Sequence, residues 1–162
     1  MRSLLLLAVA GMIAVPVSAQ EWTAEQQSLL DHVTNCWNAW VEALADETPD
    51  RFLEACPQDA RGHWWWTAQG APERLISEIQ RNWHVIRETD DDWVSLRPVY
   101  IDMFGDVGIM HLYGYWRANT ADGSVTTEMK RTEVFQRRNG TWVLIGAQSA
   151  PVTPADAEPY RR

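Results

Sequence analysis

The segment Thr132–Ile145, with the sequence TEVFQRRNGTWVLI, decides the fold. Val134-Phe135 and the apolar run Trp142–Ile145 lie on either side of Asn139-Gly140, a dipeptide that favours a two-residue hairpin turn because both residues tolerate positive φ. Similar turn signals occur upstream at Gly105-Asp106 and Asp122-Gly123. From Asp92 onward the apolar residues recur with a period of two, which is typical of strands. The segment from Asp92 to Ser149 is therefore predicted to form four long antiparallel strands joined by tight turns.

The N-terminal end is predicted to be a secretory signal. Met1-Arg2 carries one positive charge, an apolar run from Leu4 to Val15 follows, and Pro16–Ala19 supplies the small residues of a signal-peptidase site. The run is too short for a membrane span of about 20 residues. We therefore expect residues 1–19 to be cleaved and the mature protein to be periplasmic or secreted. An uncleaved N-terminal anchor is the alternative.

Composition excludes several classes of partner. The chain of 162 residues has 22 Asp and Glu against 14 Lys and Arg, a net charge of −8. Such a surface repels phosphate backbones, so we expect no nucleic acid partner.

The chain has no Gly-rich phosphate loop and no Gly-x-Ser-x-Gly motif. Its histidines are scattered and its cysteines lack close partners, so neither a metal nor another cofactor is expected.

The rest of the chain is predicted to form one domain, residues 20–150, followed by a loose tail, residues 151–162. An apolar stripe from Trp22 to Ala45 predicts a helix, and Thr23 with Gln26 resembles a capping box at its start. A second, short helix is expected between Pro49 and Pro57, and a short strand at Gly62–Thr67. A third helix is expected to begin at Pro72.

The two cysteines, Cys36 and Cys56, each lie ten residues from Asp46. A helical hairpin that turns at Asp46 would bring them side by side. In an oxidising compartment they are predicted to form a disulfide, which on the chain-entropy model stabilises a loop of this size by about 3 kcal/mol. Two buried free thiols are the alternative.

The order helix, helix, short strand, helix and long antiparallel strands resembles the nuclear transport factor 2-like superfamily. That superfamily includes SnoaL-like polyketide cyclases, ketosteroid isomerase and scytalone dehydratase. The likeness covers about Glu25 to Ser149, and the matching residues are Gly105-Asp106-Val107, Asp122-Gly123, Thr132-x-Val134-Phe135 and Asn139-Gly140-Thr141-Trp142. The resemblance implies an α+β fold in which a curved antiparallel sheet, packed against three N-terminal helices, forms a cone-shaped barrel with a cavity. Many members continue with His-x-His, where this chain has Gly146 and Gln148, so His-dependent chemistry is not carried over.

Counting outward from the turns predicts where a pocket would lie. One row across the helix-facing side of the sheet contains Arg97, Gly114, Arg131 and Gln148, and the next row contains Val99, Leu112, Glu133 and Gly146. Charged residues beside glycines on an apolar face predict a small cavity with a polar floor, because such groups are costly to bury unpaired. A solvated ion pair near the end of the sheet is the alternative. The predicted ligand pocket consists of Trp37, Trp40, Trp66, Arg97, Leu112, Gly114, Arg131, Glu133 and Gln148.

The opposite side of the sheet is predicted to be half aromatic and half polar, which suits a partner surface. It contains Tyr100, Asp102, His111, Tyr113, Tyr115, Lys130 and Thr132. The resemblance implies a homodimer through this face, and a monomer is the alternative. Among the histidines, His63 is placed best to reach a cavity mouth, whereas His32 and His84 are expected at the surface.

Three functions follow from these observations. The first is a non-catalytic module that holds a small apolar or aromatic molecule. The second, implied by the resemblance, is a cofactor-independent isomerase or lyase with Glu133 as the base and Arg131, with Arg97 or Gln148, facing a developing oxyanion. An arginine beside a carboxylate favours its charged form and so weakens it as a base. The third is an interaction module for another envelope protein.

Overall fold

A computed structural model describes residues 20–66, 73–120 and 122–153. The predicted signal segment, residues 1–19, and the end of the predicted tail, residues 154–162, lie outside the described residues. Within the described part of the chain, no helix is both long enough and apolar enough to cross a membrane.

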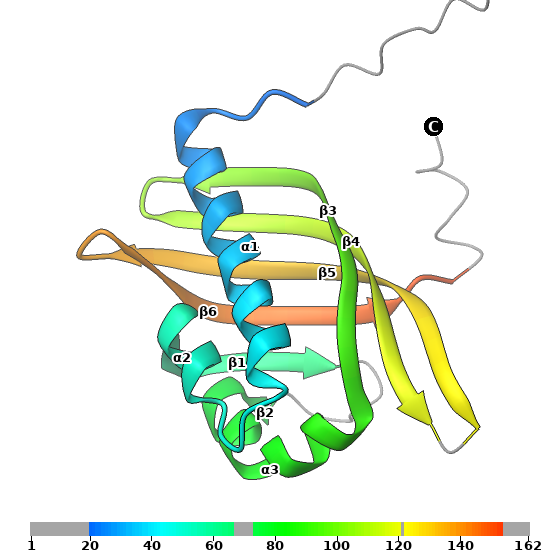
Figure 1. Ribbon diagram of the computed structural model, residues 1–162. Coiled ribbons are helices and arrows are strands. Elements are labelled where there is room, and N and C mark those ends of the chain that lie inside the picture. The colour runs from blue at the N-terminus through cyan, green and yellow to red at the C-terminus, as the bar shows by residue number, and fades with distance from the viewer. Residues whose placement is uncertain (1–19, 67–72, 121, 154–162) are drawn as a thin grey trace, which may run out of the picture.

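The described residues form an α+β fold in which one curved sheet is packed against helices (Figure 1). The strands follow the order β2-β1-β6-β5-β4-β3, with β1 parallel to β6 and the other neighbours antiparallel. The predicted fold class is confirmed, as a mixed sheet whose two edge strands, β2 and β3, do not pair with each other. The elements are α1 (Ala24–Ala43), α2 (Asp50–Ala55), β1 (Gln58–Trp66), β2 (Glu73–Arg74), α3 (Leu75–Thr89), β3 (Asp90–Phe104), β4 (Val107–Thr120), β5 (Gly123–Arg138) and β6 (Thr141–Pro151).

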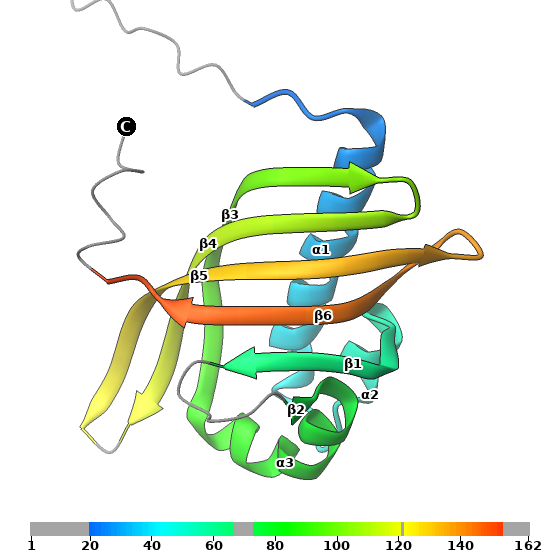
Figure 2. The ribbon, with the colours of Figure 1, turned by 180° about the vertical axis from the view of Figure 1, so that it is seen from behind.

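The helices leave one face of the sheet uncovered. Helix α1 lies across one face, and α2 and α3 lie at the end where β1 and β2 form the edge (Figure 1). Seen from behind, none of the described helices covers the opposite face of β3–β6 (Figure 2). We call these the helix side and the outer face of the sheet.

Helix α1 begins and packs as its sequence predicts. The Thr23 hydroxyl accepts a hydrogen bond from the Gln26 amide, and the Gln26 side chain accepts one from the Thr23 amide, so the capping box is confirmed. The apolar stripe is buried, and its Leu29 side chain packs against the sheet at Gly108. A Cβ at that glycine would lie 2.5 Å from Leu29 Cδ2, so the absence of a side chain lets the helix approach β4 closely.

The hairpin turns confirm two of the predicted registers. Asn139 and Gly140 have φ of 51° and 84°, and Gly105 has φ of 59°, as tight hairpin turns require. Strands β5 and β6 accordingly start in the register Arg138↔Thr141, and β3 and β4 in the register Phe104↔Val107. The helix side of the sheet is apolar and buried as predicted, through Ile101, Met110, Leu112, Met129, Phe135, Trp142 and Leu144.

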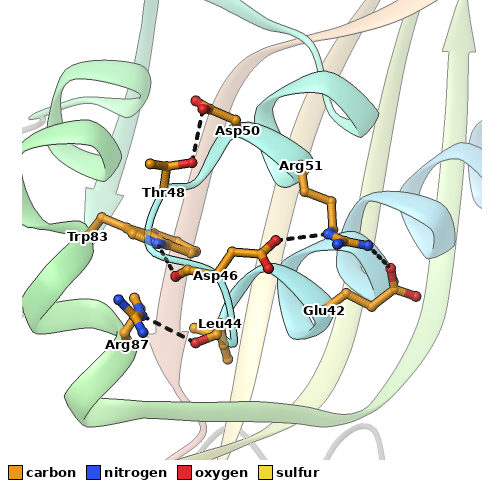
Figure 3. A network of polar contacts seen from close by, with 8 residues as sticks. All are labelled: Glu42, Leu44, Asp46, Thr48, Asp50, Arg51, Trp83 and Arg87. Carbon is orange, nitrogen blue, oxygen red and sulfur yellow. Dashed lines mark hydrogen bonds and ion pairs between the residues drawn. The ribbon is translucent and has the colours of Figure 1, made fainter.

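Polar contacts hold the turn between α1 and α2 (Figure 3). Arg51 donates to Asp46 Oδ2 at 2.9 Å and to Glu42 Oε2 at 3.1 Å. From α3, Trp83 Nε1 donates to the Asp46 carbonyl at 3.3 Å and Arg87 Nε donates to the Leu44 carbonyl at 3.4 Å. The two helices therefore form a hairpin that turns at Asp46, as the sequence predicts.

The start of the third helix differs from the prediction. Glu73 and Arg74 pair with Trp64 and His63 of β1, and α3 begins at Leu75. Pro72, where this helix was expected to begin, lies outside the described residues. The predicted short strand is found as β1 and begins earlier than expected, at Gln58.

Candidate functional site

Strand β5 places a buried ion pair on the helix side of the sheet. Arg131 Nε donates to Glu133 Oε1 at 2.6 Å, and Arg131 Nη1 donates to Ser149 Oγ on β6 at 2.7 Å. Arg131 is 4% exposed, Glu133 is 2% exposed and Ser149 is fully buried. The solvated pair that the sequence left open as an alternative is therefore excluded. The second carboxylate oxygen, Glu133 Oε2, is also buried and has no hydrogen-bond partner among the residues that the structure describes.

Two tryptophan rings enclose the guanidinium group. Arg131 Cζ lies 4.7 Å from the ring centroid of Trp37 on α1 and 4.8 Å from that of Trp64 on β1. A desolvated cation–π contact of this kind contributes about 2 kcal/mol. The arginine thus joins α1, β1, β5 and β6, and the space that the sequence predicted as a cavity around Arg131 holds aromatic rings.

The predicted position of Arg97 is wrong, because β3 contains a bulge. The pairing with β4 moves from Tyr100↔His111 to Pro98↔Leu112, so Val99 is an extra residue and the faces exchange beyond it. Arg97 therefore pairs with Tyr113 and is exposed, with its guanidinium carbon 5.4 Å from the Tyr113 ring centroid. Pro98 was the available signal, since a proline inside a strand pattern marks an edge or a bulge.

The predicted position of Gln148 is also wrong, because β6 contains a bulge as well. Along β6 the pairing with β5 moves from Phe135↔Leu144 to Val134↔Gly146, which leaves Ile145 as the extra residue. Gln148 is exposed on the outer face, and Ser149 takes its place opposite Arg131. The adjacent Gly146 was the sequence signal, because a glycine inside a strand often marks a bulge.

The other predicted pocket residues remain on the helix side or in the core. The register of β4 and β5 is displaced by two residues, so Arg131 faces Leu112 and Gly114 faces Met129, which keeps the predicted faces. Leu112 and Gly114 are buried there. The rings of Trp40 and Phe52 pack edge-on in the core, with their centroids 4.9 Å apart. The side chain of Trp66 lies outside the described residues.

The outer face contains a hollow of about 420 Å³, which we call the outer hollow. Its walls come from β3, β4, β5 and β6, and His111 Nδ1 lies 3.0 Å from Thr132 Oγ1 within it. A second hollow of about 310 Å³ adjoins it and shares Thr132 and Gln148. The outer hollow is lined by Val99, Tyr100, His111, Leu112, Tyr113, Lys130, Arg131, Thr132, Gln148 and Ala150.

The helical hairpin brings together three residues that the sequence analysis did not combine. His32 Nε2 lies 3.5 Å from Cys36 Sγ, and these two atoms and Cys56 Sγ all lie within 4.8 Å of one another. Both cysteines are free thiols in the structure and each is 2% exposed. The hairpin thus places the sulfur atoms side by side, while the disulfide between them stays a prediction. The missed signal was His32-x-x-x-Cys36, which puts two ligand side chains one helical turn apart.

Burial sets the ionisation of this cluster. Burial lowers the pKa of His32, which favours the neutral imidazole. Burial also raises the pKa of the Cys36 thiol, and the nearby Cys56 and the charge of Glu133 raise it further. Burial therefore favours the protonated thiol of Cys36 over the thiolate.

Comparisons with known proteins give a fold. No family model and no curated protein matches the sequence. A nuclear transport factor 2-like superfamily protein from Salmonella enterica superposes with a TM-score of 0.60 at 15% identity, over 83% of this chain and 96% of that chain. A ketosteroid isomerase-like protein from Erwinia carotovora superposes with a TM-score of 0.66 at 8% identity, over 82% of this chain and 100% of the other. The chain has the nuclear transport factor 2-like fold.

The same nuclear transport factor 2-like fold occurs in a further solved structure. A CamKII hub homology domain from Chlamydomonas reinhardtii also shares it, with a TM-score of 0.55 at 12% identity over 81% of this chain and 100% of that domain. In the present chain the sheet offers two faces of different character. The helix side holds a buried polar cluster among aromatic rings, whereas the outer face holds the open hollows.

Proposed function

We propose that this chain is an exported small-molecule-binding domain and that its ligand, a small aromatic molecule with an acceptor or anionic group, occupies the outer hollow. The observation that carries the proposal is the hollow itself. Its volume of about 420 Å³ lies within the range of about 300–1,000 Å³ that is typical of ligand pockets. Its lining combines aromatic rings with N–H and O–H donors, as ligand pockets commonly do.

The chemistry of the lining selects the ligand class. Tyr100, which is 58% exposed, and Tyr113 offer aromatic surfaces for a planar molecule. Lys130, His111 and Thr132 offer N–H and O–H donors, and none of the described residues that line the hollow is acidic. In a chain of net charge −8, a hollow without carboxylates favours an acceptor or an anion over a cation.

The bulges at Val99 and Ile145 support a binding site on this face. The extra residues Val99 and Ile145 lie in β3 and β6, the strands that form two of the walls. Bulges are frequent next to binding sites because they redirect a side chain to the other face of a sheet. Here the bulge in β6 turns Gln148 into the outer hollow.

A cofactor-independent isomerase or lyase is the second candidate, since Glu133 keeps one buried carboxylate oxygen without a hydrogen-bond partner in the described part of the chain. A general base must come within hydrogen-bond reach of the proton that it removes. Glu133 is 2% exposed and its other oxygen is bound to Arg131, so a substrate could reach it only if the helices moved. If the protein is an enzyme of this kind, Glu133→Gln should abolish turnover of a steroid-like or polyketide-like substrate while leaving binding intact.

Native mass spectrometry of the protein purified from its own envelope fraction tests the first proposal. We expect a chain that begins at Gln20 and carries a co-purified small molecule. Ala150→Phe fills the outer hollow and should weaken binding of that molecule at least tenfold. Ala60→Phe makes the same change at an exposed position of β1 and should not alter binding. Equal binding by both variants would refute the outer hollow as the site.

A homodimer through the outer face is the second part of the proposal. Tyr115 is 45% exposed on this face and lines neither hollow, so it supplies aromatic surface for a partner. Tyr115→Glu should therefore shift the mass measured by light scattering from dimer to monomer without changing ligand binding. A wild-type protein that is monomeric at micromolar concentration would refute the dimer and leave the ligand site standing.

A further inference from the structure

The cluster of His32, Cys36 and Cys56 has the composition of a metal site. His32 and Cys36 lie one turn apart on the same face of α1, and Cys56 follows the last residue of α2. Thiolate and imidazole are the ligands that zinc prefers in proteins. Two thiolates and a neutral imidazole around Zn²⁺ carry no net charge, which suits a site where both cysteines are 2% exposed.

The spacing of the ligand atoms fits a tetrahedral zinc ion. With Zn–S of about 2.3 Å and Zn–N of about 2.1 Å, a sulfur and a nitrogen at a tetrahedral zinc lie about 3.6 Å apart. The distance from His32 Nε2 to Cys36 Sγ is 3.5 Å. Cys56 Sγ lies within 4.8 Å of both atoms, so a small displacement of its side chain would complete the ligand triangle.

We propose that His32, Cys36 and Cys56 bind one zinc ion and leave a fourth coordination position for water or an exogenous ligand. The hairpin pre-forms the site, because contacts from Arg51 and Trp83 to Asp46 fix the turn that brings Cys56 back to α1 (Figure 3). The predicted disulfide uses the same two sulfur atoms. Zinc binding and the disulfide therefore exclude each other, and one measurement separates them.

The test measures zinc content and affinity of the reduced mature chain. Inductively coupled plasma mass spectrometry should find one zinc per chain, and cobalt substitution should give a thiolate-to-cobalt absorption band. His32→Gln should weaken zinc binding by more than the about 10–100-fold that loss of an outer-shell partner causes. His84→Gln, the same change at an exposed histidine of α3, should leave the affinity unchanged.

Cys56→Ser provides a second variant in case His32→Gln does not fold, and it should remove the cobalt band while the far-ultraviolet circular dichroism is retained. A reduced wild-type chain that takes up no zinc would overturn the proposal. So would protein from its own envelope that contains no zinc and has lost the mass of two hydrogen atoms, the sign of a Cys36–Cys56 bond.

Discussion

Replacing Arg131 by methionine removes the positive partner of a carboxylate that is 2% exposed. Breaking a buried ion pair by removing one partner costs about 3–5 kcal/mol, because the remaining charge is left without compensation. The variant also loses the contacts of the guanidinium with the Trp37 and Trp64 rings, although a methionine side chain packs well against aromatic rings. We expect Arg131→Met to lower the free energy of unfolding by about 3–5 kcal/mol, a large share of the about 5–15 kcal/mol of a typical domain.

Two further variants separate charge from packing. Glu133→Gln keeps an acceptor for Arg131, so it should cost less, about 1–3 kcal/mol. The double variant Arg131→Met/Glu133→Leu removes both charges and fills the space with apolar groups. Such replacements are often neutral in stability. The double variant should therefore be more stable than Arg131→Met alone.

Urea unfolding followed by tryptophan fluorescence measures these differences. With a slope of about 2 kcal/mol/M, Arg131→Met should lower the midpoint by about 2 M. The decisive comparison is the double-mutant cycle. A double variant as unstable as Arg131→Met would show that the loss comes from packing against the tryptophan rings, and the argument from an unpaired buried charge would be refuted.

Three other substitutions have defined outcomes. The Arg61 amide and the Arg138 side chain hold the pKa of Asp59 below its usual range, so the folded state gains stability from this carboxylate above about pH 4 and loses it as the pH falls through the lowered pKa. Asp59→Asn should accordingly lower the urea midpoint at pH 7 and lower it less at pH 3. Trp83→Phe removes the bond to the Asp46 carbonyl and part of a ring that is 3% exposed, and should cost about 1–3 kcal/mol in thermal or urea unfolding. Arg51→Ala breaks ion pairs whose arginine is 53% exposed, so it should leave the urea midpoint close to that of the wild type in the same assay.

Local signals predicted much of this fold. The capping box at Thr23 and the turn at Asn139-Gly140 each depend on interactions within a few residues, so the sequence is sufficient to place them. The register nearest each turn was accordingly correct for β3–β4 and for β5–β6. Counting gave a register two residues off for β4–β5, which kept the faces, and it assigned residues to the wrong face only beyond the bulges in β3 and β6. Bulges at Val99 and Ile145 arise from the curvature of the sheet around the helices, which is a tertiary property.

The candidate sites show the same limit. Arg131 and Glu133 were placed on the helix side correctly, because two-residue alternation within β5 needs no partner strand. Ser149 was missed because its position depends on the bulge in β6. The grouping of His32 with Cys56 was missed because it depends on how α2 packs against α1, and a spacing of 24 residues carries no signal of its own.

Strand β5 contributes side chains to both faces of the sheet. Arg131 and Glu133 point to the helix side, and the alternating residues Lys130 and Thr132 line the outer hollow. A slip of one residue in β5 would bury Lys130 and Thr132 among the core side chains and expose the ion pair. Such a slipped register is strongly disfavoured, because the buried guanidinium would lose Ser149 and both tryptophan rings. Because an apolar pair often replaces a buried ion pair at little cost in stability, we predict that Arg131 and Glu133 act chiefly on specificity, by fixing which side chains of β5 reach the outer hollow.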